Sequence, residues 1–267
     1  MPIYFTSYEG SQQPSKNAVK ATVSEFLQKI KHNSKFINGY TFYIIDNYND
    51  LRPKSIFTRE LKNHSEKYKY TGGASLCPEL NSGEKEIVIK TEELDVPRKW
   101  FYNSKPTAYV EQATMHEIGH MFDNYYGQKD NKLLKQVVQI GNNTKLDNYS
   151  PTQEKIIDKY YKNKDLSDSE EFKLAWKKDL EAYYANVGFL ERYSFKNYYS
   201  AFDIDITDGI NSEEMEKADT LRSEDFAELF GFAFGKDNGN KDRMLKILPR
   251  TYSIVKNYIK KHLGVQF

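Results

Sequence analysis

The pentapeptide H-E-I-G-H at residues 116–120 constrains the fold of this chain more than any other stretch. It lies inside residues 107–125, which predict a helix with Pro106 at a position that a first turn tolerates and Ser104 as the N-cap. Residues four apart share one face of a helix, so both histidines point the same way. The apolar neighbours of the motif indicate that this helix is buried; they are Ala113, Met115, Ile118, Met121 and Phe122. A buried imidazole pair needs polar partners.

On a helix, H-E-x-x-H is typical of a zinc site in which the imidazoles of His116 and His120 reach one metal ion. Glu117 is rotated by about 100° from His116, so it is placed to hold and deprotonate a water molecule rather than to be a ligand. The alternative is two ordinary histidines on an amphipathic helix, because the pattern also arises by chance. We favour the metal site because the chain has only five histidines, two of which have this spacing.

The composition excludes several classes of protein. A net charge of +1 over 267 residues gives no bulk charge to hold nucleic acid. No run of roughly 18 apolar residues is present, so no membrane span is predicted. The opening stretch, MPIYFTSYEGSQQPSK, lacks the pattern of a signal peptide. The 21 tyrosines are scattered, which favours packing roles over an aromatic binding cleft.

The residues before the metal helix predict a small mixed sheet with helices. Residues 1–13 look like a loose start, and apolar spacing predicts a helix over 15–32. Strands are expected at 40–46, 70–76 and 86–90, the last of them fully buried, while 57–69 is ambiguous. An exposed sheet edge beside the metal would be a natural place for an extended peptide to pair.

The residues after the metal helix predict a mostly helical half, so the expected fold class is α+β. Asp130 is expected to cap a helix that Gly141 ends. A capping-box pattern opens another helix at Ser150, and residues 167–185 predict a further amphipathic one. The acidic loop at 203–209 lacks the spacing of an EF-hand and favours a solvated loop.

A zinc ion held by two histidines needs a third protein ligand. The stretch R-S-E-D-F-A-E-L-F at residues 222–230 predicts a buried helix on which Glu224 and Glu228 lie four apart. A carboxylate on a buried helix needs a partner, and a metal ion would supply one. The spacing alone does not choose between these two glutamates.

H-E-I-G-H followed by E-D-F-A-E-L-F resembles the catalytic domain of anthrax lethal factor and its relatives, which include the clostridial Pro-Pro endopeptidases. The match continues into residues 248–252 (L-P-R-T-Y), which resemble the opening of the family's last helix. The resemblance implies a zincin-like metallopeptidase fold, with His116, His120 and Glu224 as zinc ligands. It also implies that Glu228 orients a ligating histidine. A secreted bacterial protease of the toxin or virulence type is the implied class.

This chain departs from the family pattern in two ways, in the distance between the zinc-ligand motifs and in the position of the oxyanion tyrosine. His120 and Glu224 are 104 positions apart (224 − 120), longer than the family core needs, which predicts a helical insertion around 142–215. The family's oxyanion tyrosine precedes the ligand glutamate, but Lys217 stands at that place. Tyr199, or its neighbour Tyr198, is the candidate if the insertion follows it. We therefore expect an N-terminal segment and helix at 1–35 and a catalytic domain at 36–267.

The implied reaction is endoproteolysis of an extended protein or peptide substrate. Zn²⁺ would activate water, Glu117 would act as general base, and Tyr199 would stabilise the oxyanion. The alternative functions are a catalytically inactive zinc-binding toxin or adhesion module of the same fold, and a binding protein whose histidine pair is incidental. Family members cut host signalling kinases or extracellular proline-rich proteins. A substrate inside host cells would require flanking sequence or a separate delivery partner.

Overall fold

The structure is a computed structural model that describes residues 3–7, 13–31, 33–52, 55–65, 73–76, 85–91, 107–143, 149–186, 218–237 and 241–267. The first half contains β1 (Tyr4–Ser7), α1 (Gln13–Ile30), β2 (Thr41–Ile45), a 3-10 turn η1 (Tyr48–Asp50), α2 (Ile56–Asn63), β3 (Gly73–Leu76) and β4 (Glu86–Lys90). The second half contains α4 (Ala108–Asp130), α5 (Leu134–Asn143), α6 (Pro151–Tyr161), η3 (Leu166–Asp168), α7 (Glu170–Asn186), α10 (Asp219–Ala233), α11 (Lys241–Ile247) and α12 (Pro249–Leu263).

A four-stranded mixed sheet has the order β1-β2-β4-β3. The first three strands in that order run parallel, and β3 pairs antiparallel with β4 at one edge. Phe42 and Ile87, which are register partners, face the main core, while Tyr43 and Val88 face a second cluster with Leu61 of α2. Both sheet faces are therefore covered, which explains why every residue of β4 is buried, as predicted.

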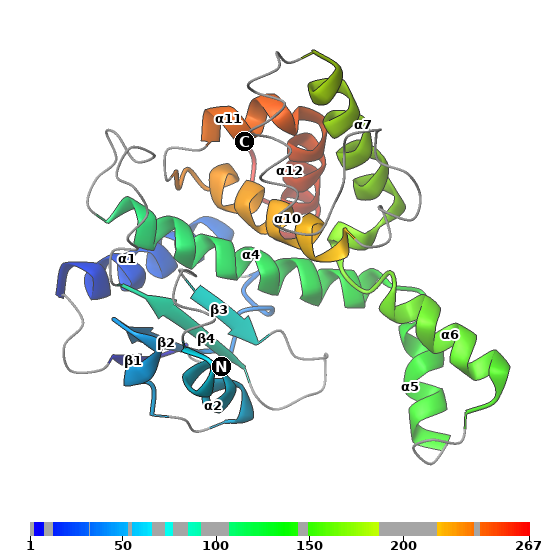
Figure 1. Cartoon of the computed structure of the whole chain (residues 1–267), viewed down its shortest axis with the longest axis horizontal. Coiled ribbons are helices and arrows are strands. Elements are labelled where there is room, and N and C mark those ends of the chain that lie inside the picture. The colour runs from blue at the N-terminus through cyan, green and yellow to red at the C-terminus, as the bar shows by residue number, and fades with distance from the viewer. Residues whose placement is uncertain are drawn as a thin grey trace.

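Helix α4 forms the middle layer of the molecule. It contacts α1 and the strands β3 and β4 on one side, and α10 on the other (Figure 1). Phe122 lies at the centre of this arrangement and packs against Phe36, which precedes β2, and against Phe226 and Phe230 of α10. The predicted mixed sheet followed by a mostly helical half is confirmed, and α1 shares one core with the metal helix.

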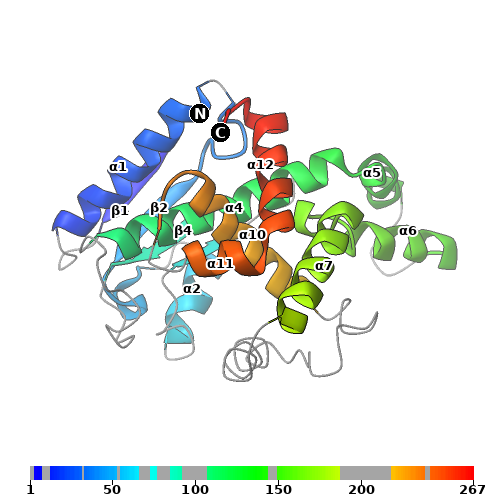
Figure 2. The same ribbon diagram turned by 90° about the horizontal axis from the view of Figure 1, so that it is seen from above.

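Helices α5 and α6 pack against each other and extend away from the rest of the molecule at the far end of α4 (Figures 1 and 2). The predicted capping box at the start of α6 is present: the Ser150 hydroxyl accepts from the Gln153 backbone N–H, and the Gln153 side chain accepts from the Ser150 N–H. Whether this hairpin belongs to an insertion over 142–215 stays a prediction, because residues 187–217 lie outside the described part.

The predicted start of α4 is correct to within one residue, but its N-cap and its far end differ from the prediction. Thr107 holds the N-cap position, later than the predicted Ser104, and its hydroxyl donates to Glu111 instead of accepting a backbone N–H. The helix also runs on to Asp130, where the carboxylate pairs with Lys261 of α12. His262 of α12 also stacks on Tyr126 and lies 3.3 Å from Asp130, so contacts with α12 accompany the helix beyond residue 125.

Three further expectations were wrong. Residues 1–13 are not all irregular, because β1 pairs with β2, and Phe5 packs on Phe42 with ring centroids 5.4 Å apart. Asp130 does not cap α5: the side chain of Asn131 accepts the Leu133 N–H before that helix begins. Gly141 lies inside α5 instead of ending it.

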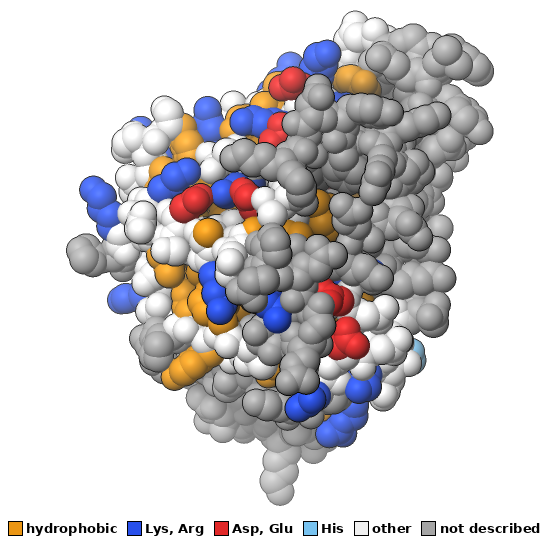
Figure 3. All heavy atoms as spheres, turned by 90° about the vertical axis from the view of Figure 1, so that its left-hand side faces the viewer, with side chains coloured by type: hydrophobic (Ala, Val, Ile, Leu, Met, Phe, Trp, Pro, Cys, Tyr) orange, Lys and Arg blue, Asp and Glu red, His pale blue; other side chains and the backbone are white. Residues whose placement is uncertain are grey.

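The distribution of charged side chains on the surface agrees with the net charge of +1. Figure 3 shows side chains of both charges interspersed on one face, with apolar areas between them. Among the described residues, no helix is long and apolar enough to cross a membrane.

Candidate metal centre

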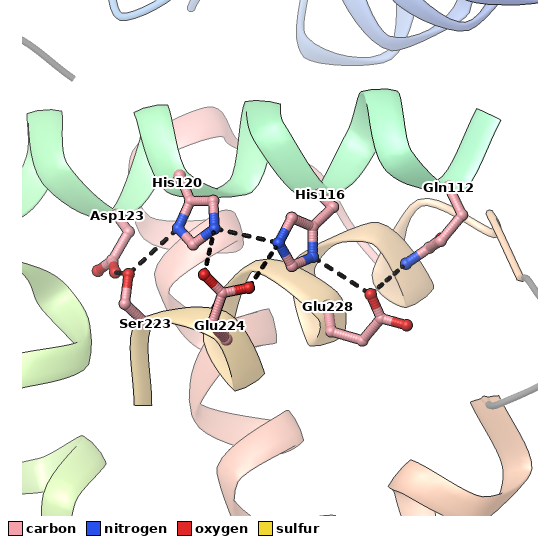
Figure 4. A network of polar contacts seen from close by, with 7 residues as sticks. All are labelled: Gln112, His116, His120, Asp123, Ser223, Glu224 and Glu228. Carbon is pink, nitrogen blue, oxygen red and sulfur yellow. Dashed lines mark hydrogen bonds and ion pairs between the residues drawn. The ribbon is translucent and has the colours of Figure 1, made fainter. Parts of the chain in front are cut away.

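Helix α4 presents the two motif histidines on one face, toward α10 (Figure 4). Their ring centroids are 4.7 Å apart with the planes at 82°, and their Nε2 atoms are 3.1 Å apart. Both side chains keep partial access to solvent, at 19% for His116 and 16% for His120. The i, i+4 spacing therefore converges the two Nε2 atoms on one point, as the sequence predicted.

Helix α10 brings Glu224 to that same point. Its Oε2 is 3.1 Å from Nε2 of His116, and its Oε1 is 3.5 Å from Nε2 of His120. Glu228, one turn further along, instead lies 3.2 Å from Nδ1 of His116. The geometry thus assigns different places to two glutamates that the sequence spacing could not distinguish. Glu224 contacts the Nε2 atoms of both histidines, and Glu228 contacts the Nδ1 atom of His116.

The three donor atoms fit a metal ion. His116, His120 and Glu224 form the metal-capable group of His, Cys, Asp and Glu side chains among the described residues, with ligand atoms within 4.8 Å of one another. Tetrahedral donors at about 2.0–2.1 Å from an ion lie roughly 3.3 Å apart. The closest donor separations, 3.1 to 3.5 Å, match that spacing.

Close packing of α4 against α10 brings the side chains of His116, His120 and Glu224 together. A Cβ added to Gly119 would lie 2.8 Å from the Cα of Ala227 and 3.0 Å from its carbonyl oxygen. A Cβ added to Gly231 would lie 2.7 Å from Nε2 of Gln112. Glycine at 119 lets the backbones of α4 and α10 approach closely, and glycine at 231 leaves room for the Gln112 side chain.

Each imidazole has a partner on its other nitrogen. Glu228 Oε2 faces Nδ1 of His116 and accepts a hydrogen bond from Nε2 of Gln112 at 3.1 Å. Ser223 Oγ faces Nδ1 of His120 at 3.1 Å. A proton on each Nδ1 leaves both Nε2 lone pairs directed at the shared point, which is the tautomer that metal binding requires.

The charges around the site favour a cation. Burial alone would raise the pKa of Glu224, but hydrogen bonds with His116 and His120 outweigh it and hold the pKa below its usual range. Burial would lower the pKa of His116, yet the two glutamates raise it well above its ordinary value. Without a metal, the raised pKa of His116 favours a proton on that ring, and a metal ion would displace it.

Glu117, the predicted general base, is 6% exposed and follows His116 on α4. Its charge contributes to the raised pKa of His116, so the carboxylate lies close to the site. It is absent from the metal-capable group, as the sequence predicted from its rotation around the helix.

Some site residues were missed and some cannot be located. Sequence reasoning missed Gln112, Ser223 and Asp123, although Asp123 follows His120 by three positions and shares its helix face. Tyr199 and Tyr198, the candidates for the oxyanion tyrosine, lie outside the described residues, as does the acidic loop at 203–209.

Comparison with known proteins adds no assignment. The chain matches no protein-family model, and no curated protein matches its sequence.

Proposed function

We propose that this chain is a zinc-dependent endopeptidase with a zincin-like fold, akin to the catalytic domain of anthrax lethal factor. The observation that carries the proposal is the contact of Glu224 with Nε2 of both histidines of H-E-x-x-H. Two imidazoles and one carboxylate are the protein ligands of many catalytic zinc sites, which leave a further position open. The resemblance also underlies our proposal that the protein is secreted, as a bacterial protease of the toxin or virulence type.

The residues around the site support this chemistry. Zn²⁺ held by His116, His120 and Glu224 would lower the pKa of a bound water molecule toward neutrality and polarise the scissile carbonyl. Glu117 would accept the proton of the attacking water and pass it to the leaving amine. Glu228 and Gln112 keep the proton of His116 on Nδ1, so that Nε2 stays available.

The sheet supports binding of an extended substrate. Strand β3 stands at the end of the strand order, runs antiparallel to β4, and contacts the metal helix α4. Backbone groups on the outer side of such an edge strand can pair with an extended peptide. A substrate bound along this edge would lie beside α4, the helix that carries the two histidines, whereas a folded segment could not pair in this way.

The decisive experiment is Glu117→Gln tested on an unbiased peptide library. We expect cleavage to fall by roughly 10²–10⁴-fold, the usual contribution of a general base, with zinc content near one ion per chain. Glu154→Gln is the matched control, because Glu154 is exposed on α6 and should leave both properties unchanged.

Two outcomes would contradict the proposal. Unchanged cleavage by the Glu117→Gln variant would exclude the assigned base. Absence of cleavage by the zinc-loaded natural chain would leave a metal-binding toxin or adhesion module as the better description. The library profile would also identify the preferred substrate sequence.

A further inference from the structure

The two histidines of the metal site are supported on their Nδ1 atoms in different ways. His116 meets a carboxylate directly, because Glu228 Oε2 lies 3.2 Å from its Nδ1. His120 meets a hydroxyl, Ser223 Oγ, at 3.1 Å, and that hydroxyl is 3.4 Å from Oδ2 of Asp123 (Figure 4). The second histidine thus reaches a carboxylate through an intermediate serine.

The direction of these hydrogen bonds follows from the metal site. A metal ion on Nε2 of His120 requires the ring proton to be on Nδ1, so Nδ1–H donates to Ser223 Oγ. The serine hydroxyl then has its own proton to donate, and Asp123 Oδ2 is the acceptor within reach. The chain of donors therefore runs from His120 through Ser223 to Asp123.

Asp123 is firmly held at the end of this chain. It is 1% exposed and accepts two hydrogen bonds from Ser167, one from the backbone N–H at 2.8 Å and one from the hydroxyl at 2.7 Å. Burial, followed by the nearby Asp165, raises the pKa of Asp123 well above its usual range, although the hydrogen bonds from Ser167 oppose this shift. The carboxyl group is thus fixed by η3, an element that contributes no metal ligand.

A second set of contacts fixes the serine. Arg222, which precedes Ser223 on α10, is 2% exposed and pairs with Asp168 of η3 at 3.1 Å. The short turn η3 therefore holds both members of the relay: Ser167 holds Asp123, and Asp168 holds the residue before Ser223. These contacts add η3 to the two helices that already carry the relay and the metal ligands.

We propose that Ser223 and Asp123 are positioning residues that orient His120 and fix its metal-binding tautomer. This inference rests on the proposed zinc site and adds two residues to it. It predicts that both histidines depend on α10, His116 through Glu228 and His120 through Ser223, and that His120 depends in addition on η3, which holds Asp123.

The test compares Ser223→Ala with Ser223→Thr. Alanine removes the hydroxyl and should weaken zinc binding by roughly 10- to 100-fold, the usual effect of losing a group that orients a ligand. Threonine keeps a hydroxyl and should stay within about 3-fold of the natural chain. Zinc affinity is measured by competition with a chelator, and the visible absorption of the Co²⁺-loaded protein reports the ligand geometry independently of activity.

A second pair of variants tests the carboxylate. Asp123→Asn replaces one acceptor oxygen with a donor and should weaken zinc binding and alter the Co²⁺ spectrum, as Ser223→Ala does. Asp158→Asn is the matched control, because it makes the same change of charge at an exposed position on α6, away from the site (Figure 1). Circular dichroism of each metal-free variant checks that its fold is retained.

The results separate this inference from the proposed function. Natural affinity and an unchanged Co²⁺ spectrum in Ser223→Ala would overturn the relay, even if Glu117→Gln behaved as expected. Equal losses in the alanine and threonine variants would also overturn it, because packing and not the hydroxyl would then be responsible. If the natural chain binds no zinc, the proposed function itself fails.

Discussion

Gly119 shows at the scale of one residue how the motif and the fold depend on each other. In H-E-x-x-H the two middle positions are free, yet this chain has glycine where α4 crosses Ala227 of α10. A side chain at position 119 would collide with the backbone of Ala227. A backbone atom cannot shift without moving the whole of α10. The identity of this residue is therefore set by the distance between the helices that carry the ligands.

We expect Gly119→Ala to weaken the metal site. Alanine favours a helix by roughly 1 kcal/mol over glycine, but overpacking against a backbone costs about 1–3 kcal/mol. Relief of the contact requires α4 and α10 to separate, which moves Glu224 away from both histidines. Zinc affinity should fall at least 10-fold, measured by chelator competition. Gly141→Ala, in α5, is the matched control, and equal affinities for both variants would contradict this account.

The residues of the candidate site were partly readable from the sequence. The periodicity of one helix is enough to place His116 and His120 on one face, and the buried stretch at 222–230 pointed to Glu224 or Glu228. Ser223 and Asp123 could not be found in this way. Their pairing depends on how α10 crosses α4, and that crossing is set by packing between segments 100 positions apart.

At the scale of elements, helix α12 begins with a cap supplied by another helix. Its own N-cap residue, Leu248, has no side chain that can accept a hydrogen bond. Asp179 of α7 fills this role, because its Oδ2 accepts from the Thr251 backbone N–H at 2.8 Å and from the Thr251 hydroxyl at 2.9 Å. The threonine in the L-P-R-T-Y stretch is thus explained by a contact that no local pattern reveals.

Removing this cap should destabilise the fold without emptying the metal site. Asp179→Ala leaves the buried Thr251 N–H without its partner, and we expect a loss of roughly 1–3 kcal/mol in the free energy of unfolding. Urea denaturation measures it. The control is Ser253→Ala, because Ser253 is exposed on the same helix and its loss should cost under about 1 kcal/mol. A loss no larger than that of the control would refute the capping role.

Element boundaries were harder to predict than the elements themselves. Helix α1 follows apolar periodicity, and strands β2 and β4 are continuous runs of β-branched and aromatic residues. Strand β1 has only four residues and gains its stability from pairing with β2, so its own sequence carries little signal. The far end of α4 depends on Lys261, which lies 131 positions further along the chain.

At the scale of the whole molecule, metal binding should be a major source of stability. The ligands come from the two helices that form the centre of the fold, so an ion bound there favours the folded state. Binding stabilises a protein by about 4 kcal/mol when free zinc exceeds its dissociation constant roughly 1,000-fold. For a chain of this size we expect removal of zinc with a chelator to lower Tm by roughly 8 °C.

Scanning calorimetry with and without zinc tests this expectation. Glu224→Ala should remove the zinc-dependent part of Tm, because it deletes the only ligand that α10 supplies to the described site. Glu117→Gln should retain it, since Glu117 is not a ligand. A zinc-dependent Tm that survives in Glu224→Ala would move the third ligand to another residue, with Glu228 as the first alternative.

The position of the ligands along the chain also determines the order of events during folding. His120 and Glu224 are separated by 104 positions that include the α5–α6 hairpin and α7. Closing so long a loop is slow and costs chain entropy, so Glu224 joins the histidines only after most of the fold has formed. Zinc should then bind a nearly finished structure. It would slow unfolding while leaving the refolding rate almost unchanged.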